Sequence, residues 1–498
     1  MCTCIDLSLS QQPLNKMKKA ELVFIPPPVP GHLVPLIEFA KGLFDRNDHF
    51  SVTVLLIQFP TITSLVAEYT KSFAESNVPI RLINLPPPVH FCPSQEPYKS
   101  IEKFVTELVD YHKACIKEAI VKHVVSNENS AQLAGLVVDI FSTSMIDVAN
   151  ELGVPSYLFF TSCAAFLGLL MFLPTRHAEI GREFEEFDGE AVIPCYVNPV
   201  PSSGMPEVLL SKYGGYTTFL NHGRRVKETG GIIVNTFEEL ESHAVKCLMN
   251  DFDNVPPVYT VGPLIDLKDE SNKLDSDVIM KWLDDQPDSS VVFLCFGSMG
   301  SFGKDQAKEI AFGLEQSGVR FLWSFRKSPR KDKLEAPSDY NSDVLQEILP
   351  NGFLERTKKI GLVCGWAPQK AVLAHKSVGA FVSHCGWNSI LESLWFGVPI
   401  VTWPLYAEQQ LNALQLVKDL GLAVELRLDY KISKGELVNA DEIERAIKCA
   451  MDGKNDVRKR FKEKSEMSRL AVMEGGSSYA AFGGLIENIA RNKAMKEE

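Results

Sequence analysis

The amino-acid sequence predicts an α/β protein in which two Rossmann-like β/α/β domains face each other across a cleft. The chain has 498 residues, and at roughly 150 residues per domain this length corresponds to two or three domains. Hydrophobic residues make up 45% and charged residues 23%, close to the average for globular proteins, so wholesale disorder and fibrous repeats are excluded. In both halves, short apolar segments alternate with helical patterns, which is typical of parallel sheets wrapped by helices.

The first domain is expected to span residues 20–257, after an N-terminal extension of residues 1–19. Its apolar segments predict strands over residues 21–25, 51–57, 135–140 and 156–160. Amphipathic patterns predict helices over residues 33–44, 101–125 and 142–152. Strands that are apolar on both faces indicate a parallel sheet with helices on each side.

The second domain is expected to span residues 281–476, joined to the first by a polar, turn-rich linker over residues 258–280. Strands are predicted over residues 291–296, 320–325, 361–364, 379–383, 400–403 and 423–426. A Gly-rich loop, residues 297–303, precedes a predicted helix over residues 305–316. Residues 477–498 predict a C-terminal helix that packs back on the first domain.

One apolar stretch raises the alternative of a membrane span. Residues 154–174 run 21 positions without a charge, which is long enough to cross a bilayer. The stretch begins at a Gly-Val-Pro turn and divides at Thr161-Ser162, which favours a buried strand followed by a buried helix capped near Ser162. We therefore expect no transmembrane segment.

Charge and cysteine usage narrow the class of partner. The formal net charge is −12, which disfavours nucleic acid and anionic membranes as general partners. The eleven cysteines are scattered and form no zinc or redox motif within a folded segment. Two Asp-x-Asp strings, at 251–253 and 275–277, lack a preceding apolar strand, so no metal is expected. The absence of a signal-peptide pattern and of glycosylation sequons favours a cytoplasmic protein, expected to be a monomer.

Two polar residues stand at predicted strand ends in the first half. His32 follows the loop after the first strand, and Asp139 ends an otherwise apolar strand. A carboxylate in such a position needs a partner to offset its desolvation. The alternative is that Asp139 caps the following helix. A carboxylate and an imidazole at the ends of strands in one sheet are also the arrangement that orients a histidine base.

The densest polar run extends from Trp366 to Gln409. The segment VGAFVSHCG predicts a strand that delivers His384 to a turn, after which a helix opens at Gly386-Trp387-Asn388-Ser389. Free backbone N–H groups at a helix start, together with an imidazole and small polar side chains, suit a diphosphate. The tryptophans at 366 and 387 offer flat faces for a base or sugar ring. The carboxylates at 392 and 408 and the amide at 409 offer hydrogen-bond acceptors to hydroxyl groups.

This run resembles the plant secondary-product signature of family 1 UDP-glycosyltransferases, whose fold is the two-domain GT-B fold. The match covers all 44 positions from 366 to 409, and the similarity extends over nearly the whole chain. It is greatest for the branch that glucosylates flavonoids, other phenolics and triterpenes. The resemblance implies that His32 is the catalytic base and Asp139 its partner. It also implies a donor site built from Ser298, Trp366, Ala367, Gln369, His384, Trp387, Asn388, Ser389, Glu392, Glu408 and Gln409.

Within that implied donor site, Trp366, Ala367 and Gln369 contact the uridine, and Glu392 holds the ribose hydroxyls. His384, Asn388, Ser389 and Ser298 hold the diphosphate, while Trp387, Glu408 and Gln409 contact the sugar. Acceptor walls are expected from first-domain loops. The apolar candidates are Pro28, Val29, Phe91, Phe141, Met205, Tyr213 and Phe219.

The expected activity is an inverting transfer of glucose from UDP-α-glucose to a hydroxyl of a small lipophilic plant metabolite, with UDP-glucose as co-substrate and no further cofactor. One alternative is a catalytically silent small-molecule binder on the same fold, which would not need both His32 and Asp139. Another is a nucleotide-dependent oxidoreductase, which would want G-x-G-x-x-G after its first strand, where this chain has PPPVPG.

Overall fold

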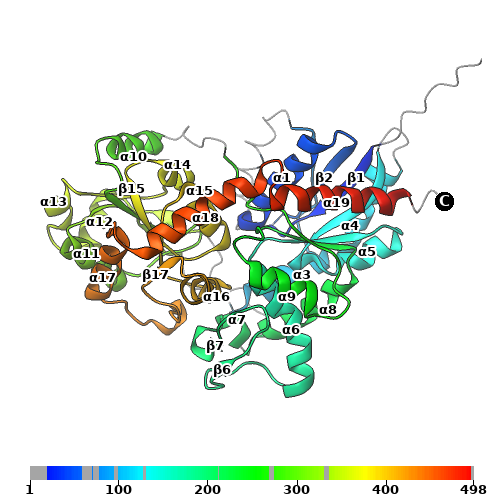
Figure 1. Cartoon of the computed structure of the whole chain (residues 1–498), viewed down its shortest axis with the longest axis horizontal. Coiled ribbons are helices and arrows are strands. Elements are labelled where there is room, and N and C mark those ends of the chain that lie inside the picture. The colour runs from blue at the N-terminus through cyan, green and yellow to red at the C-terminus, as the bar shows by residue number, and fades with distance from the viewer. Residues whose placement is uncertain are drawn as a thin grey trace, which may run out of the picture.

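The computed structural model contains two parallel sheets, each wrapped by helices and placed side by side (Figure 1). It describes residues 19–58, 70, 78–94, 99–126, 131–210, 212–267, 274–329 and 336–494. All neighbouring strands within both sheets are parallel. The α/β fold class predicted from the alternating pattern is therefore confirmed.

The first sheet has seven strands in the order β3-β2-β1-β4-β5-β8-β9. Their bounds are β1 Ala20–Ile25, β2 Phe50–Leu56, β3 Ile80–Asn84, β4 Gln132–Asp139, β5 Ser156–Phe160, β8 Gly231–Val234 and β9 Val258–Thr260. The inner strands are buried along their length because helices cover both faces. The order reverses between β1 and β4, so the carboxyl ends of these two strands open the crevice in which α/β proteins bind ligands.

Helices of the first half flank this sheet and surround the crevice. They are α1 Pro30–Arg46, α3 Ile101–Tyr111, α4 Lys113–Ile120, α5 Met145–Glu151, α6 Ala164–Ile180, α7 Glu207–Leu210, α8 Gly215–Arg225 and α9 Ser242–Asn250. A small antiparallel ribbon, β6 Glu190–Ala191 with β7 Val200–Pro201, lies beyond α6.

The second sheet has six strands in the order β14-β11-β10-β15-β16-β17. Their bounds are β10 Val291–Cys295, β11 Arg320–Ser324, β14 Gly361–Cys364, β15 Val378–Ser383, β16 Ile400–Thr402 and β17 Ala423–Glu425. The helices around it are α10 Leu274–Asp284, α11 Lys304–Ser317, α12 Ser342–Ile348, α13 Phe353–Thr357, α14 Gln369–Ala374, α15 Trp387–Phe396, α16 Gln409–Leu414 and α17 Ala440–Met451. Arg326–Lys327 (β12) and Ser338–Asp339 (β13) form a short ribbon.

The last two helices return the chain to the first half. In Figure 1, α18 (Asp456–Val472) and α19 (Ser477–Ala494) run from the second sheet toward the first. Phe482 on α19 packs against Phe39 of α1 with ring centroids 5.2 Å apart. Asn492 donates a hydrogen bond of 3.0 Å to the hydroxyl of Tyr157 in β5. The end of the chain therefore packs against elements from its beginning.

The structure corrects three local expectations. The helix predicted over residues 101–125 is broken at His112, whose ring bonds the carbonyl of Leu108 at 2.8 Å and competes with the backbone ladder there. Residues 258–260 form strand β9 on the edge of the first sheet, so the connection between the sheets begins after them. The cap of α6 is Cys163, which accepts from the N–H of Phe166, whereas Ser162 points to the second half.

The apolar stretch 154–174 forms β5 and the first part of α6, as expected for buried core. Among the helices that the structure describes, none is both long and apolar enough to cross a membrane.

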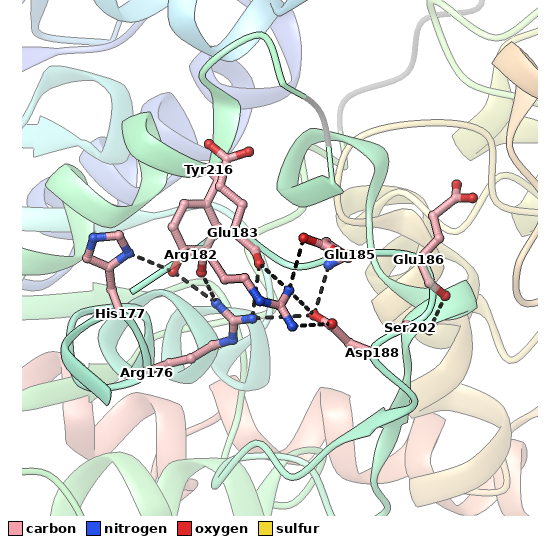
Figure 2. Close-up of polar contacts among 9 residues, drawn as sticks. All are labelled: Arg176, His177, Arg182, Glu183, Glu185, Glu186, Asp188, Ser202 and Tyr216. Atoms are coloured by element: carbon pink, nitrogen blue, oxygen red, sulfur yellow. Dashed lines mark hydrogen bonds and ion pairs between the residues drawn. The ribbon is translucent and has the colours of Figure 1, made fainter. Parts of the chain in front are cut away.

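The C-terminal end of α6 is held by a polar network around Arg176 (Figure 2). The Arg176 side chain is 4% exposed and donates to the carbonyl of Arg182 at 2.7 Å and to the Tyr216 hydroxyl at 3.1 Å. Asp188 Oδ2 lies 3.6 Å from Arg176 Nη2. The Asp188 carboxylate also accepts from Nη1 and Nη2 of Arg182 at 3.1 and 2.7 Å. These bonds tie the segment after α6 to the helix end.

Candidate active site

A histidine–carboxylate pair occupies the crevice at the carboxyl edge of the first sheet. His32 lies in the first turn of α1, which Pro30 starts, and Asp139 is the last residue of β4. His32 Nδ1 and Asp139 Oδ2 are 2.8 Å apart because β1 and β4 are adjacent and parallel. Asp139 Oδ1 accepts from the N–H of Phe141 at 3.0 Å. Asp139 thus both caps the turn at 140–142 and orients the imidazole, leaving Nε2 as the basic nitrogen.

The surroundings of His32 favour its protonated form. Burial alone lowers the pKa of His32, and it is the largest single effect. The charge and hydrogen bond of Asp139, together with the charge of Glu408, outweigh burial, so the pKa lies above the ordinary value. This arrangement stabilises the imidazolium that forms when His32 takes a proton.

A second buried histidine, His384, follows β15 in the other half. A Cβ at Gly297, where φ is +74°, or at Gly386 would lie 2.6 Å from His384 Nε2, so both glycines are needed for the close approach. Burial lowers the pKa of His384 to about 4, so the ring is neutral at physiological pH. Its Nδ1 is buried and has no hydrogen-bond partner within the described part of the chain. A neutral imidazole beside the open amides of a helix start suits a diphosphate oxygen.

Four predicted donor residues gather at α14 and α15. Gln369 Nε2 donates to Ser389 Oγ at 2.9 Å and to Glu392 Oε2 at 2.7 Å. Asn388 Nδ2 donates to the carbonyl of Gly31 at 2.8 Å, next to His32. The start of α15 therefore touches the loop that carries His32.

Three other predicted donor residues lie near these helices. Trp366 follows β14 and is partly exposed, and Ala367 beside it is buried. Ser298 is exposed in the Gly-rich loop after β10. Their proposed contacts with the nucleotide stay predictions.

The residues predicted to contact the sugar are placed differently from one another. Glu408 Oε1 accepts from Ser162 Oγ at 2.8 Å, and the charge of Glu408 raises the pKa of His32. Gln409 is 3% exposed, and its Oε1 accepts from the N–H groups of Leu405 and Tyr406. Trp387 is also 3% exposed.

The indole N–H of Trp387 donates to the carbonyl of Asn235 in the first half at 2.7 Å. The hydrogen bonds of Trp387 and Gln409 to backbone groups therefore stabilise the fold, and their contacts with the sugar stay predictions.

Among the predicted acceptor residues, Phe141 lies beside His32 and against Phe219. The Phe141 ring is 5.4 Å from His32 and 6.1 Å from Phe219, centroid to centroid. Val29 and Phe91 pack against the same apolar cluster as Phe141. Pro28, in the same loop, is buried.

Two further predicted acceptor residues, Met205 and Tyr213, differ in their exposure. Met205 is 0% exposed and packed in the core, and its contact with an acceptor stays a prediction. Tyr213 is half exposed, with the Lys99 ammonium 5.7 Å from its ring.

Sequence reasoning missed several polar groups in this crevice. Thr161 Oγ1 lies 3.1 Å from His32 Nδ1. His222, whose pKa burial lowers to about 4, bonds Thr106 at 3.0 Å and Thr143 at 2.7 Å behind Phe141. Burial raises the pKa of Glu102 to about 7, helped by the charges of Glu408 and Glu207. The signal for Thr161 was present, since it directly follows an apolar strand, as His384 does.

The described residues contain no cluster of three or more His, Cys, Asp or Glu side chains placed to hold a metal ion.

Comparisons with known proteins identify the family to which the chain belongs. The family described as "UDP-glucoronosyl and UDP-glucosyl transferase" matches residues 233–456. The chain is 52% identical to UDP-glycosyltransferase 71K1 of Malus domestica, over 95% of this chain and 99% of that protein. It is 48% identical to UDP-glucose flavonoid 3-O-glucosyltransferase 6 of Fragaria ananassa, again over 95% and 99%.

Solved structures give the same result. Medicago truncatula UGT71G1 complexed with UDP-glucose superposes with a TM-score of 0.82 at 43% identity, covering 95% of this chain and 98% of that one. Phytolacca americana UGT2, complexed with UDP-2-fluoro-glucose and pterostilbene, gives 0.81 at 35% identity, covering 95% and 100%. The GT-B fold implied by the resemblance is therefore confirmed. The chain belongs to the plant family 1 UDP-glycosyltransferases and is a UDP-glucosyltransferase that acts on plant metabolites.

Proposed function

We propose that the enzyme transfers glucose from UDP-glucose, with inversion, to a hydroxyl of a flavonoid, another phenolic or a terpenoid. The observation that carries the proposal is the His32–Asp139 pair, 2.8 Å apart, beside the aromatic wall of Phe141 and Phe219. An aromatic wall beside a base suits a flat, lipophilic acceptor whose hydroxyl reaches the imidazole. The named activities of the Fragaria relative and of an anthocyanidin 3-O-glucosyltransferase of Manihot esculenta, 49% identical, support a flavonoid acceptor.

The first half would hold the acceptor and the second half UDP-glucose. His32 Nε2 removes the proton of the acceptor hydroxyl while the oxygen attacks the anomeric carbon of glucose. The new C–O bond forms as the bond from the anomeric carbon to the diphosphate breaks, and UDP leaves with the electron pair. Asp139 stabilises the resulting imidazolium.

The donor side stabilises the leaving group. His384, Asn388, Ser389 and the amides at the start of α15 surround the place where a diphosphate would sit, and a helix N-terminus favours negative charge. Gln369 and Glu392, which are bonded to each other, would hold the ribose. Glu408 would accept hydrogen bonds from glucose hydroxyls. Its negative charge would repel a sugar that carries a carboxylate.

The competing candidate is a silent binder on the same fold. The buried charge of Asp139 argues against it, because a carboxylate at this position with its histidine costs desolvation that a binder does not need.

The two candidates separate in one assay with UDP-glucose and a panel of quercetin, resveratrol and a triterpene alcohol. We expect UDP release and a product heavier by one hexose, and His32→Ala should reduce both most strongly with the triterpene alcohol, whose hydroxyl does not ionise without a base. His49→Ala is the matched control, because His49 is exposed in the turn between α1 and β2. Acceptor binding without UDP release by the wild-type enzyme would establish the silent binder.

A further inference from the structure

The turn between β5 and α6 connects the base to the donor side through three consecutive side chains. Thr161 Oγ1 lies 3.1 Å from His32 Nδ1. Ser162 Oγ donates to Glu408 Oε1 at 2.8 Å, and Cys163 Sγ donates to Asn412 Oδ1 at 3.3 Å. The last two bonds cross from the first half of the chain to the second, so this turn spans the cleft at the point where chemistry would occur.

The turn is anchored by α6, which is held at both ends. At its start, the buried carboxylate of Glu241 accepts from the N–H groups of Ala164 at 2.9 Å and Ala165 at 3.1 Å. Glu241 also accepts from Gln415 of the second half at 2.9 Å. At its end, the Arg176 network fixes the helix to the following segment (Figure 2). A helix fixed in this way gives Ser162 a defined position.

The Glu408 carboxylate has only weak support from its own helix, α16. Glu408 follows Ala407, whose φ is +54°, and precedes α16. Its Oε1 receives the hydrogen bond from Ser162 and a longer one, 3.5 Å, from Asn412 Nδ2. With Oε1 engaged by Ser162, the carboxylate plane is set and Oε2 can accept from a sugar hydroxyl.

We propose that Ser162 is a positioning residue that orients Glu408 toward the sugar of the donor and thereby aligns the anomeric carbon with His32. This inference rests on the proposed function, in which Glu408 contacts the sugar. Because Glu408 faces the sugar and not the nucleotide, loss of the Ser162 hydroxyl should weaken binding of UDP-glucose and leave binding of UDP unchanged.

Calorimetry on the full-length enzyme tests this directly. Ser162→Ala should raise the Kd of UDP-glucose about tenfold, the usual effect of losing a hydrogen bond to a charged group, while the Kd of UDP changes less than twofold. In a Glu408→Ala background, adding Ser162→Ala should have no further effect, because the partner is already gone. Ser317→Ala is the matched control: it removes a buried serine hydroxyl that donates to the carbonyl of Leu314 at 2.7 Å at the end of α11, and it should leave the ratio of the two Kd values unchanged.

Two results would overturn the proposal. Equal weakening of UDP and UDP-glucose by Ser162→Ala would mean that Ser162 only supports the fold. Additive effects of Ser162→Ala and Glu408→Ala would mean that the hydrogen bond is not used. Both readouts are binding constants, so they are independent of the transfer reaction. A wild-type enzyme that binds UDP-glucose with this Ser162 dependence but transfers no hexose would contradict the proposed function and leave the role of Ser162 intact.

Discussion

His32, which is partly buried, and His384, which is buried, lie at the carboxyl edges of the two sheets, yet their surroundings shift their pKa values in opposite directions. His32 faces Asp139 and Glu408, and its pKa is raised despite burial. His384 lies between glycines, and burial lowers its pKa to about 4. The same residue type at the same place in the fold is therefore suited to act as a base in one half and as a neutral hydrogen-bonding group in the other. Whether the pKa of the ring is raised or lowered depends on whether a carboxylate lies beside it.

The largest expected effect is on the base. His32→Ala should reduce kcat by roughly 100-fold or more on an aliphatic alcohol, the usual contribution of a general base. The Kd of UDP-glucose should stay within about twofold, because the donor residues lie in the other half. An aliphatic alcohol is required, since an easily ionised phenol partly escapes the need for a base. Wild-type turnover of the alcohol would disprove the role of His32.

A smaller loss is expected for Asp139→Asn, of about tenfold or more in kcat/KM. His32 must be neutral to accept a proton, so activity falls as the pH drops through its pKa, which lies above 6.5 in the wild type. The Asn variant removes the charge that raises this pKa and keeps the burial that lowers it. The acidic limb of the pH–rate profile should therefore move to lower pH. If the acidic limb does not move and the rates equal those of the wild type, Asp139 acts only as a cap for residues 140–142.

On the donor side, His384→Ala should weaken UDP binding by about tenfold, the effect of one hydrogen bond to a charged group. The acidic limb of the activity profile should stay where it is in the wild type, because His384 is already neutral far below that pH. The pH–rate profiles of His384→Ala and Asp139→Asn together test whether only the pKa of His32 controls activity at acidic pH. A shift of the limb in His384→Ala equal to that in Asp139→Asn would remove the contrast.

The smallest expected effect concerns donor choice. Glu408 lies close enough to act on His32 and is expected to repel the carboxylate of UDP-glucuronic acid. Wild-type enzyme should prefer UDP-glucose, with UDP-galactose and UDP-xylose poorer and UDP-glucuronic acid poorest. Glu408→Gln should narrow the gap between glucose and glucuronic acid about fivefold, which corresponds to about 1 kcal/mol. Competition between donors at equal concentration measures this, and a glucuronide as the main wild-type product would refute the role of Glu408.

The two halves also differ in how much of the site the sequence predicts. All six strands of the second sheet were predicted to within a few residues, because parallel strands buried on both faces are continuous apolar segments. In the first sheet β1, β2, β4 and β5 were predicted, whereas β3 and β8 were missed and β9 was assigned to the linker. Gln369, His384, Asn388, Ser389 and Glu392 come from one run of the sequence, and the structure gathers them around α14 and α15.

The predicted acceptor residues come from separate segments, among them the turn at 140–142 and α8, and their contacts with an acceptor stay predictions. Phe141 lies beside His32 and Phe219 packs against Phe141, whereas Met205 is buried in the core, because composition alone does not say which way an apolar side chain points. The break at His112 and the bond from Ser162 to Glu408 depend on side-chain geometry between distant segments, which no local pattern encodes.

The central claim is that the acceptor oxygen, freed of its proton by His32, attacks the face of glucose opposite UDP in a single displacement. The most direct measurement is the anomeric configuration of the glucoside, read from the proton coupling at the anomeric carbon by NMR on the product of wild-type enzyme and UDP-α-glucose. A single displacement requires a pure β-glucoside. An α-glucoside would require two displacements or attack from the face of the leaving group, and would contradict the role assigned to His32 and Asp139.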